Sequence, residues 1–199
     1  MKAMVLKTYD EALKNDVWVS MQDVPDAKIS SPDDVIVRIG GAGVCRTDLH
    51  IIEGIWKPLV DPTGEALLPM IMGHENAGWV EEVGTNVRGL RKGDPVILHP
   101  KITDPFDINV RRGHDMHAEG KFLGLDCDGG YAEYLTTNQR NIVALPEHLE
   151  PKAVAAFADA GLTAYHASKK ASQQLLPGQF VVVIGAGGLG HIGIQVLKA

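Results

Sequence analysis

The chain has 199 residues, a formal net charge of −6, 45% hydrophobic and 22% charged residues, and two cysteines, Cys45 and Cys127. The acidic balance argues against a general nucleic-acid binder, no apolar run approaches the roughly 18 residues that span a bilayer, and two cysteines do not indicate a disulfide scaffold. We therefore expect a cytoplasmic globular enzyme without a nucleic-acid or membrane partner.

Short β-prone segments separated by turn residues fill residues 1–146. They are residues 4–6, 17–19, 35–39, 77–84, 93–98, 129–135 and 141–145. Many short strands without regular helices between them favour a small β-barrel-like domain. Residues 53–72 are expected as a loop because prolines interrupt them, and residues 99–124 because they are polar and aperiodic.

One segment after the third of these strands is dense in chemically reactive side chains. Within six positions it carries a thiol, a guanidinium, a hydroxyl, a carboxylate and an imidazole, from Cys45, Arg46, Thr47, Asp48 and His50. We expect a short helix here, because Thr47 and Asp48 are residue types that cap helices.

Two further polar positions complete a possible metal-ligand set. His74 and Glu75 follow an apolar run, and Asp159 lies among alanines. One thiolate, one imidazole and one carboxylate suit a zinc ion whose fourth position stays open. Taken singly, Cys45 also fits a small buried residue, His74 a core histidine, and Asp159 a helix cap.

The pattern changes after Pro146. Residues 152–157 and 163–172 are helical in character, residues 180–184 form an apolar run typical of a strand buried on both faces, and residues 188–199 form an amphipathic helix. The turn between strand and helix carries glycines in a Gly-x-Gly-x-x-Gly pattern, at Gly185, Gly187 and Gly190.

Glycines at such a turn let the backbone approach a pyrophosphate at the helix N-terminus, which predicts dinucleotide binding. The alternative is an ordinary strand-to-helix turn. One strand cannot form a sheet alone, so we expect the chain to be truncated, with on the order of 100–150 further residues in the whole polypeptide.

The ordered motifs resemble those of the zinc-dependent medium-chain alcohol dehydrogenases. The similar segments are residues 43–48, 73–75, 129–134, 161–165 and 183–190. The resemblance implies a mixed fold: an N-terminal GroES-like β-barrel catalytic domain over residues 1–150, followed in residues 151–199 by linker helices and the first βα unit of an α/β Rossmann domain.

The same resemblance implies that Cys45, His74 and Asp159 hold one catalytic zinc ion. Many members have cysteine where Asp159 stands, and a carboxylate keeps the formal ligand charge while supplying a harder donor. Glu75 is implied as an outer residue or a transient ligand. Asp48 is implied either to orient a ligand or to anchor the segment, with helix capping as the alternative.

For catalysis, the resemblance implies that zinc polarises the substrate oxygen while Thr47 and His50 relay the proton. A hydride then passes between the substrate and the nicotinamide of NAD, with NADP not excluded. The residues implied to bind this cofactor are Arg46 at the pyrophosphate, Thr163 beside the nicotinamide, and Gly185, Gly187, Gly188, Leu189 and Gly190 at the turn.

The sequence departs from the family in the lobe near residues 100–120. Many members hold a second, structural zinc there with four cysteines, but the corresponding positions are Asp104, Asp107, Val110 and Ala118. We therefore expect no four-cysteine site, and a lobe that is less ordered or held by other contacts. A metal bound by Asp104, Asp107, His114 and His117 is the less favoured alternative to a solvated loop.

The leading function is thus oxidation or reduction of small apolar or aromatic alcohols and carbonyls, with Trp56 as a candidate pocket wall. The alternatives are a polyol or sugar dehydrogenase, a zinc-free quinone-type reductase and a non-catalytic cofactor-binding protein. Cys45, His74 and Asp159 together argue against the quinone-type reductase. We expect a full-length homodimer or homotetramer, and an inactive 199-residue chain.

Overall fold

The computed structural model describes residues 1–64, 67–176 and 178–199. Its largest element is a five-stranded antiparallel sheet in the order β10-β6-β5-β3-β9. The strands are β3 (Asp34–Gly43), β5 (Glu75–Val83), β6 (Pro95–Leu98), β9 (Tyr134–Asn138) and β10 (Ile142–Ala144). The expected β-rich N-terminal part is confirmed.

Two smaller sheets accompany the large one. The first has the order β2-β1-β4, and the second pairs β7 with β8. Their bounds are β1 (Lys2–Leu6), β2 (Val19–Asp23), β4 (Met70–Ile71), β7 (Lys101–Thr103) and β8 (Gly120–Phe122). Burial of valine and leucine side chains stabilises the large sheet, with Val35, Val37, Val80, Val96 and Leu98 in one cluster.

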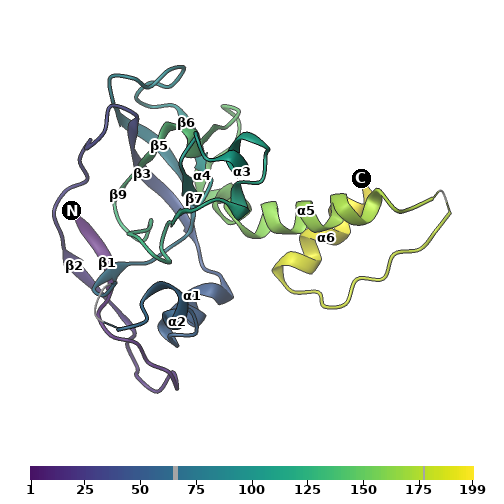
Figure 1. Cartoon of the computed structure of the whole chain (residues 1–199), viewed down its shortest axis with the longest axis horizontal. Helices are drawn as coiled ribbons and strands as arrows, with labels where there is room; N and C mark the ends of the chain where they lie inside the picture. Colours follow the sequence, from purple (N-terminus) through teal and green to yellow (C-terminus); the bar gives the residue numbers. More distant parts are fainter. Residues whose placement is uncertain (65–66, 177) are drawn as a thin grey trace.

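The helices lie at the edge of the β part and beyond it (Figure 1). They are α1 (Arg46–Ile52), α2 (Lys57–Val60), α3 (Ile108–Arg111), α4 (Pro151–Val154), α5 (Ala160–Ser172) and α6 (Gly188–Lys198), with 3-10 turns η1 (Asp115–His117), η2 (Gln139–Asn141) and η3 (Ala155–Ala158). Figure 1 shows α5 projecting away from the β part, with α6 beside it. None of the helices in the described residues is long and apolar enough to cross a bilayer.

The two expected loops contain regular structure, so that prediction is wrong in part. Residues 53–72 include α2, whose first turn holds Pro58, a position where the missing N–H of proline costs little. They also include β4, and positions 65–66 lie outside the described residues. Residues 99–124 include β7, α3, η1 and β8. Strand β4 forms by pairing with β1, which is distant in the sequence, so local periodicity does not reveal it.

Two strand predictions are also wrong. The strand expected over residues 129–135 begins only at Tyr134, because residues 129–131 instead bond to residues 71–73. Residues 180–184 are not a strand: they pair with no described segment, and Phe180 and Ile184 are 96% and 97% exposed. An apolar run needs a neighbouring strand to become one.

The C-terminal helices match the prediction more closely. The expected helix over residues 188–199 is α6, which lies against α5 where the Ser168 hydroxyl donates to the Gly193 carbonyl at 3.4 Å. Its expected apolar face is only partly covered, since Leu189 and Ile194 are each 45% exposed. The predicted domain division at residue 150 stays a prediction, although α4 packs against β3 and β5.

The lobe near residues 100–120 is held by hydrogen bonds. The Lys101 ammonium donates to the carbonyls of Met116 and Ala118 at 3.0 and 2.8 Å. The Asp107 carboxylate caps α3 by accepting from the Asn109 N–H at 2.7 Å. The Lys101 contacts join the two ends of the lobe, and the Asp107 contact stabilises the helix within it.

Candidate metal centre

Strand register brings Cys45 and His74 to one edge of the large sheet. Strands β3 and β5 are antiparallel, and Gly43, the last residue of β3, pairs with Glu75, the first residue of β5. Cys45 lies two residues after β3, and His74 immediately precedes β5. Two side chains 29 positions apart in the sequence therefore meet where the strands end.

Each of these residues is placed by a local backbone feature. Cys45 has an extended backbone and is the N-cap of α1. Gly73, before His74, has φ +99°, a conformation that side chains disfavour, and a Cβ there would lie 2.5 Å from the ring of Tyr131. Glycine is thus required just before His74.

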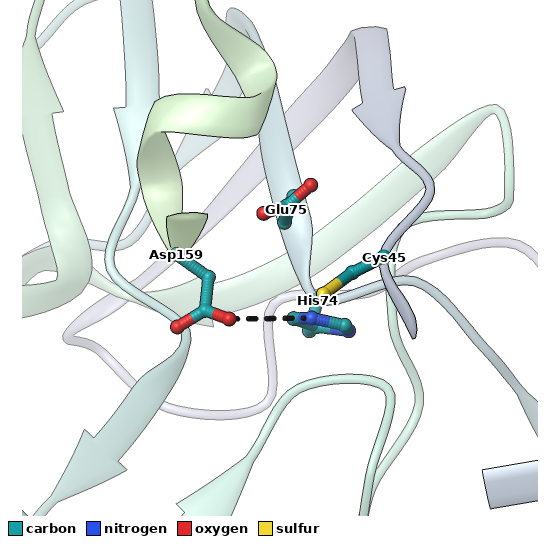
Figure 2. Close-up of side chains that lie close together, drawn as sticks. All are labelled: Cys45, His74, Glu75 and Asp159. Atoms are coloured by element: carbon teal, nitrogen blue, oxygen red, sulfur yellow. Dashed lines mark ion pairs between the residues drawn. The ribbon is translucent and has the colours of Figure 1, made fainter. Parts of the chain in front are cut away.

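Asp159 completes the group from the other side. It lies between η3, which packs on β5, and α5. Ligand atoms of Cys45, His74, Glu75 and Asp159 all lie within 4.8 Å of one another. Figure 2 shows the Cys45 sulfur and the Asp159 carboxylate approaching the His74 ring, with Glu75 further along β5.

The geometry of this group fits a metal better than a hydrogen-bond network. Both ring nitrogens of His74 are buried and lack a hydrogen-bond partner within the described residues, and Asp159 Oδ2 lies 3.5 Å from Nε2. Zinc bonds of about 2.0–2.3 Å in tetrahedral geometry separate neighbouring ligand atoms by about 3.3–3.8 Å. The 3.5 Å between His74 Nε2 and Asp159 Oδ2 lies within this range, and no pair of ligand atoms in the group is more than 4.8 Å apart. No second group of three such side chains occurs within the described residues, so the alternative site in the lobe gains no support.

Asp48 contacts both the His74 ring and the backbone of Cys45. Its Oδ1 atom forms an ion pair with His74 Nδ1 at 3.3 Å, and its Oδ2 atom accepts from the Cys45 N–H at 2.8 Å. The two predictions for Asp48, orienting a ligand and capping the helix, are therefore compatible. A carboxylate behind a histidine fixes the ring orientation and raises its basicity.

Charge balance in the pocket favours a cation. Burial lowers the pKa of the His74 imidazole, but the carboxylates of Asp159 and Asp48 outweigh burial and raise it to about 10. The His74 contact in turn lowers the pKa of Asp159, whereas burial raises that of Glu75. The carboxylates of Asp48 and Asp159 lie on either side of the imidazole and give the pocket negative charge, which favours a bound cation.

Glu75 has a partner of its own. Its Oε1 atom accepts from the Ala160 N–H at 2.9 Å, and its side chain is almost completely buried, at 2% exposure. This bond ties the start of α5 to β5, next to Asp159. Glu75 therefore fixes the position of Asp159 in addition to lying within the metal-binding group.

The residues expected to relay a proton lie on α1. Thr47 Oγ1 is 3.7 Å from the sulfur of Cys45. The Nε2 atom of His50 accepts from Arg46 Nε at 3.2 Å, and Arg46 also approaches the Glu53 carboxylate at 3.5 Å. Arg46 is thus exposed and bonded to His50 of its own helix and to the residue that ends that helix, Glu53.

The expected cofactor residues form two separate features. Thr163, one turn into α5, donates its hydroxyl to Asp159 Oδ1 at 3.3 Å, and so touches the metal-binding group. At the glycine turn, Gly185 has φ +96°, and a Cβ on Gly190 would lie 1.9 Å from the Gly185 carbonyl oxygen. Gly187 is the N-cap of α6, followed by Gly188 and Leu189. Within the described residues, no hydrogen bond joins this turn to the metal-binding group.

Sequence reasoning did not identify Tyr131 as a site residue. Its hydroxyl lies 3.0 Å from Asp48 Oδ2, although the two residues are 83 positions apart. The only signal in the sequence was the glycine-rich segment before it, which indicated a close backbone approach but not its partner.

Comparison with known proteins places these observations among dehydrogenases. Residues 31–147 match the model of the alcohol dehydrogenase GroES-like domain. The chain is 35% identical to an NAD-dependent alcohol dehydrogenase of Sulfolobus acidocaldarius, over all of this chain and 56% of the relative. It is 36% identical to a D-arabinose 1-dehydrogenase (NADP(+)) of Saccharolobus solfataricus, over all of this chain and 54% of the relative.

A solved structure of an alcohol dehydrogenase is also similar to this chain. The crystal structure of the alcohol dehydrogenase of the archaeon Aeropyrum pernix superimposes with a TM-score of 0.89 at 46% identity, covering 100% of this chain and 56% of that one. The chain thus spans about half the length of the relatives it matches.

Proposed function

This chain belongs to the medium-chain alcohol dehydrogenase family, and from that premise we propose that the protein interconverts alcohols and aldehydes or ketones by NAD(P)-linked hydride transfer at a zinc centre. The observation that carries the proposal is the meeting of a thiol, an imidazole and two carboxylates within 4.8 Å of one another. Three protein ligands with an open fourth position are typical of catalytic zinc.

In this proposal Cys45, His74 Nε2 and Asp159 hold the ion. A bound zinc ion would supply Lewis-acid polarisation of the substrate oxygen. Asp48 keeps the His74 ring in place, and Glu75 anchors the helix that begins after Asp159. The chain's own residues therefore set the distances between the donors before an ion binds.

We assign proton transfer to Thr47 and His50. The Thr47 hydroxyl lies next to the Cys45 sulfur, where it can exchange a proton with a substrate hydroxyl beside the same donor group. His50 lies three residues on, so it is on the same side of α1, and imidazole is the side chain best suited to proton exchange with solvent near neutral pH.

We assign dinucleotide binding to the glycine turn, with Arg46 and Thr163 as additional contacts. The positive φ at Gly185 and the close approach of Gly190 give a tight turn into the N-terminus of α6, where backbone N–H groups favour a phosphate. Thr163 touches Asp159, which suits a place beside the reacting end of the cofactor. NAD is the expected cofactor, and NADP is the alternative because relatives named for each are similar to the chain.

The test follows nicotinamide absorbance while the whole protein is offered short-chain and aromatic alcohols, with zinc content measured in the same preparation. We expect turnover that a chelator abolishes and zinc restores. Asp159→Ala should abolish both zinc retention and turnover, whereas Asp107→Ala, which removes a carboxylate from the lobe, should change neither. Turnover that persists in zinc-free protein would refute the proposal.

A sugar or polyol substrate is the second candidate, because a relative that covers the whole chain at 36% identity is a D-arabinose 1-dehydrogenase. Trp56 argues for an apolar substrate, since it stands half-exposed at the start of α2 near the end of α1. Comparing kcat/KM for benzyl alcohol and for D-arabinose separates the two. We expect the aromatic alcohol to be preferred, and Trp56→Ala to reduce that preference.

We further propose a cytoplasmic homodimer or homotetramer, as expected for the whole protein. Light scattering on the purified protein measures the mass of the assembly. A monomer at micromolar concentration would contradict this part of the proposal and leave the zinc site untouched.

A further inference from the structure

Tyr131 is fixed in place by its backbone on both sides. Its N–H donates to the Met72 carbonyl at 2.9 Å, and its own carbonyl accepts from the Met4 N–H at 2.7 Å. The ring packs over Gly73, where a Cβ would lie 2.5 Å from it. The side chain is thus anchored by β1 and by the segment that leads directly to His74.

The hydroxyl of this anchored ring reaches the loop that carries Cys45. It lies 2.9 Å from the Gly43 carbonyl oxygen and 3.0 Å from Asp48 Oδ2. Its single proton can be donated to only one of them, and the carboxylate is the stronger acceptor. Burial, followed by the negative charge of Asp48, raises the pKa of the Tyr131 hydroxyl. The group therefore stays protonated and acts as a donor.

The two oxygens of Asp48 consequently have different surroundings. Oδ2 faces two donors, the Tyr131 hydroxyl and the Cys45 N–H at 2.8 Å, whereas Oδ1 faces His74 Nδ1 at 3.3 Å. Asp48 is 3% exposed, so water does not compete freely for it. Two donors on one oxygen hold the carboxylate plane and direct the other oxygen at the ring.

We propose that Tyr131 is a positioning residue of the metal centre, which acts through Asp48 to hold the His74 ring with Nε2 toward Cys45 and Asp159. The inference rests on the proposed zinc function, and it adds a residue that does not touch the ion. Partners behind a ligating histidine alter metal affinity by about 10–100-fold when they are removed. Tyr131 contacts Asp48 rather than His74 itself, so we expect the effect of its removal on metal affinity to be at the lower end of this range.

The test is Tyr131→Phe, which removes the hydroxyl and keeps the ring over Gly73. Zinc affinity is measured by competition with a chromophoric chelator, and we expect a loss of about tenfold. Tyr134→Phe, in β9, is the matched control, since it removes a hydroxyl from another half-buried tyrosine three residues away. It should leave zinc affinity within about twofold.

A double-mutant cycle separates positioning from general loosening. If Tyr131 acts through Asp48, adding Tyr131→Phe to Asp48→Asn should cost less than threefold, although it costs about tenfold in the unaltered chain. Equal losses in the two backgrounds, or no loss in either, would overturn the inference. If Tyr131→Phe is unstable without metal, the rate of cobalt release from loaded protein is measured for the same four chains, and the effect of Tyr131→Phe is compared between the two backgrounds in the same way.

Failure of the inference can be told apart from failure of the proposed function. An unaltered chain that binds no zinc contradicts the function itself. An unaltered chain that binds zinc tightly, together with a Tyr131→Phe variant that binds it equally well, contradicts only the role of Tyr131.

Discussion

Replacing Lys101 by methionine tests what holds the lobe near residues 100–120. The ammonium donates to the carbonyls of Met116 and Ala118 at 3.0 and 2.8 Å, and Lys101→Met removes both bonds while keeping an unbranched apolar stem. A hydrogen bond to a charged group contributes about 1.5–3 kcal/mol. One of these bonds is exposed and the other partly buried, so solvent screening reduces their sum to about 1–2 kcal/mol.

Urea unfolding measures the loss directly, and a thermal scan should show a fall of about 2–4 °C per kcal/mol for a chain of this size. The matched control is Lys92→Met, which removes an exposed ammonium paired with Glu81 and should cost less than about 1 kcal/mol. Amide hydrogen exchange should accelerate at residues 116–118 in the Lys101 variant alone. Equal stability losses in the two variants, with unchanged exchange in the lobe, would refute this account of the lobe.

Two further predictions concern the metal-binding group. Burial, and then the Asp126 charge, raise the pKa of the Cys127 thiol to about 12, so only about one molecule in 10⁴ carries the Cys127 thiolate at pH 8. An alkylating reagent should therefore modify Cys45 before Cys127. Bound zinc should protect Cys45 from this reagent. The Gly43→Ala substitution would place a Cβ 2.1 Å from Glu75 Oε2. Displacing the Glu75 carboxylate from the Ala160 N–H should lower the free energy of unfolding in urea by about 1–3 kcal/mol, and should weaken zinc binding. An unchanged urea midpoint would contradict this prediction.

The sequence predicted best those features that depend on residues close together in the chain. Cys45 at the end of a strand, the short helix after it, and the helix over residues 188–199 were all predictable from residue type and periodicity. The β-rich character of the first part followed from strand-forming residues separated by turn residues, without knowledge of which strands pair.

What the sequence alone could not supply were contacts between distant segments. The meeting of Cys45 with His74 depends on the register of β3 with β5, and that of both with Asp159 on the packing of η3 against β5. The resemblance to a known family, rather than periodicity, brought these residues together. The link from Tyr131 to Asp48 was missed because nothing near either residue indicates the other.

The strand expected over residues 180–184 was predicted from the sequence but does not form. Its apolar residues fit a buried strand, yet they form no strand and are exposed, because no described segment pairs with them. Local pattern gives the tendency to form a strand, whereas a neighbouring strand provides the hydrogen bonds and the burial that make one.

The most direct test of the metal centre is replacement of the ion by cobalt(II), with the absorption spectrum recorded for four chains: unaltered, Cys45→Ser, Asp159→Asn and Cys127→Ser. We predict one cobalt per chain with an intense thiolate-to-metal band, which Cys45→Ser abolishes, Asp159→Asn shifts, and Cys127→Ser leaves unchanged. A cobalt spectrum that is the same with and without the Cys45 thiol would contradict the metal centre on which the proposed function depends.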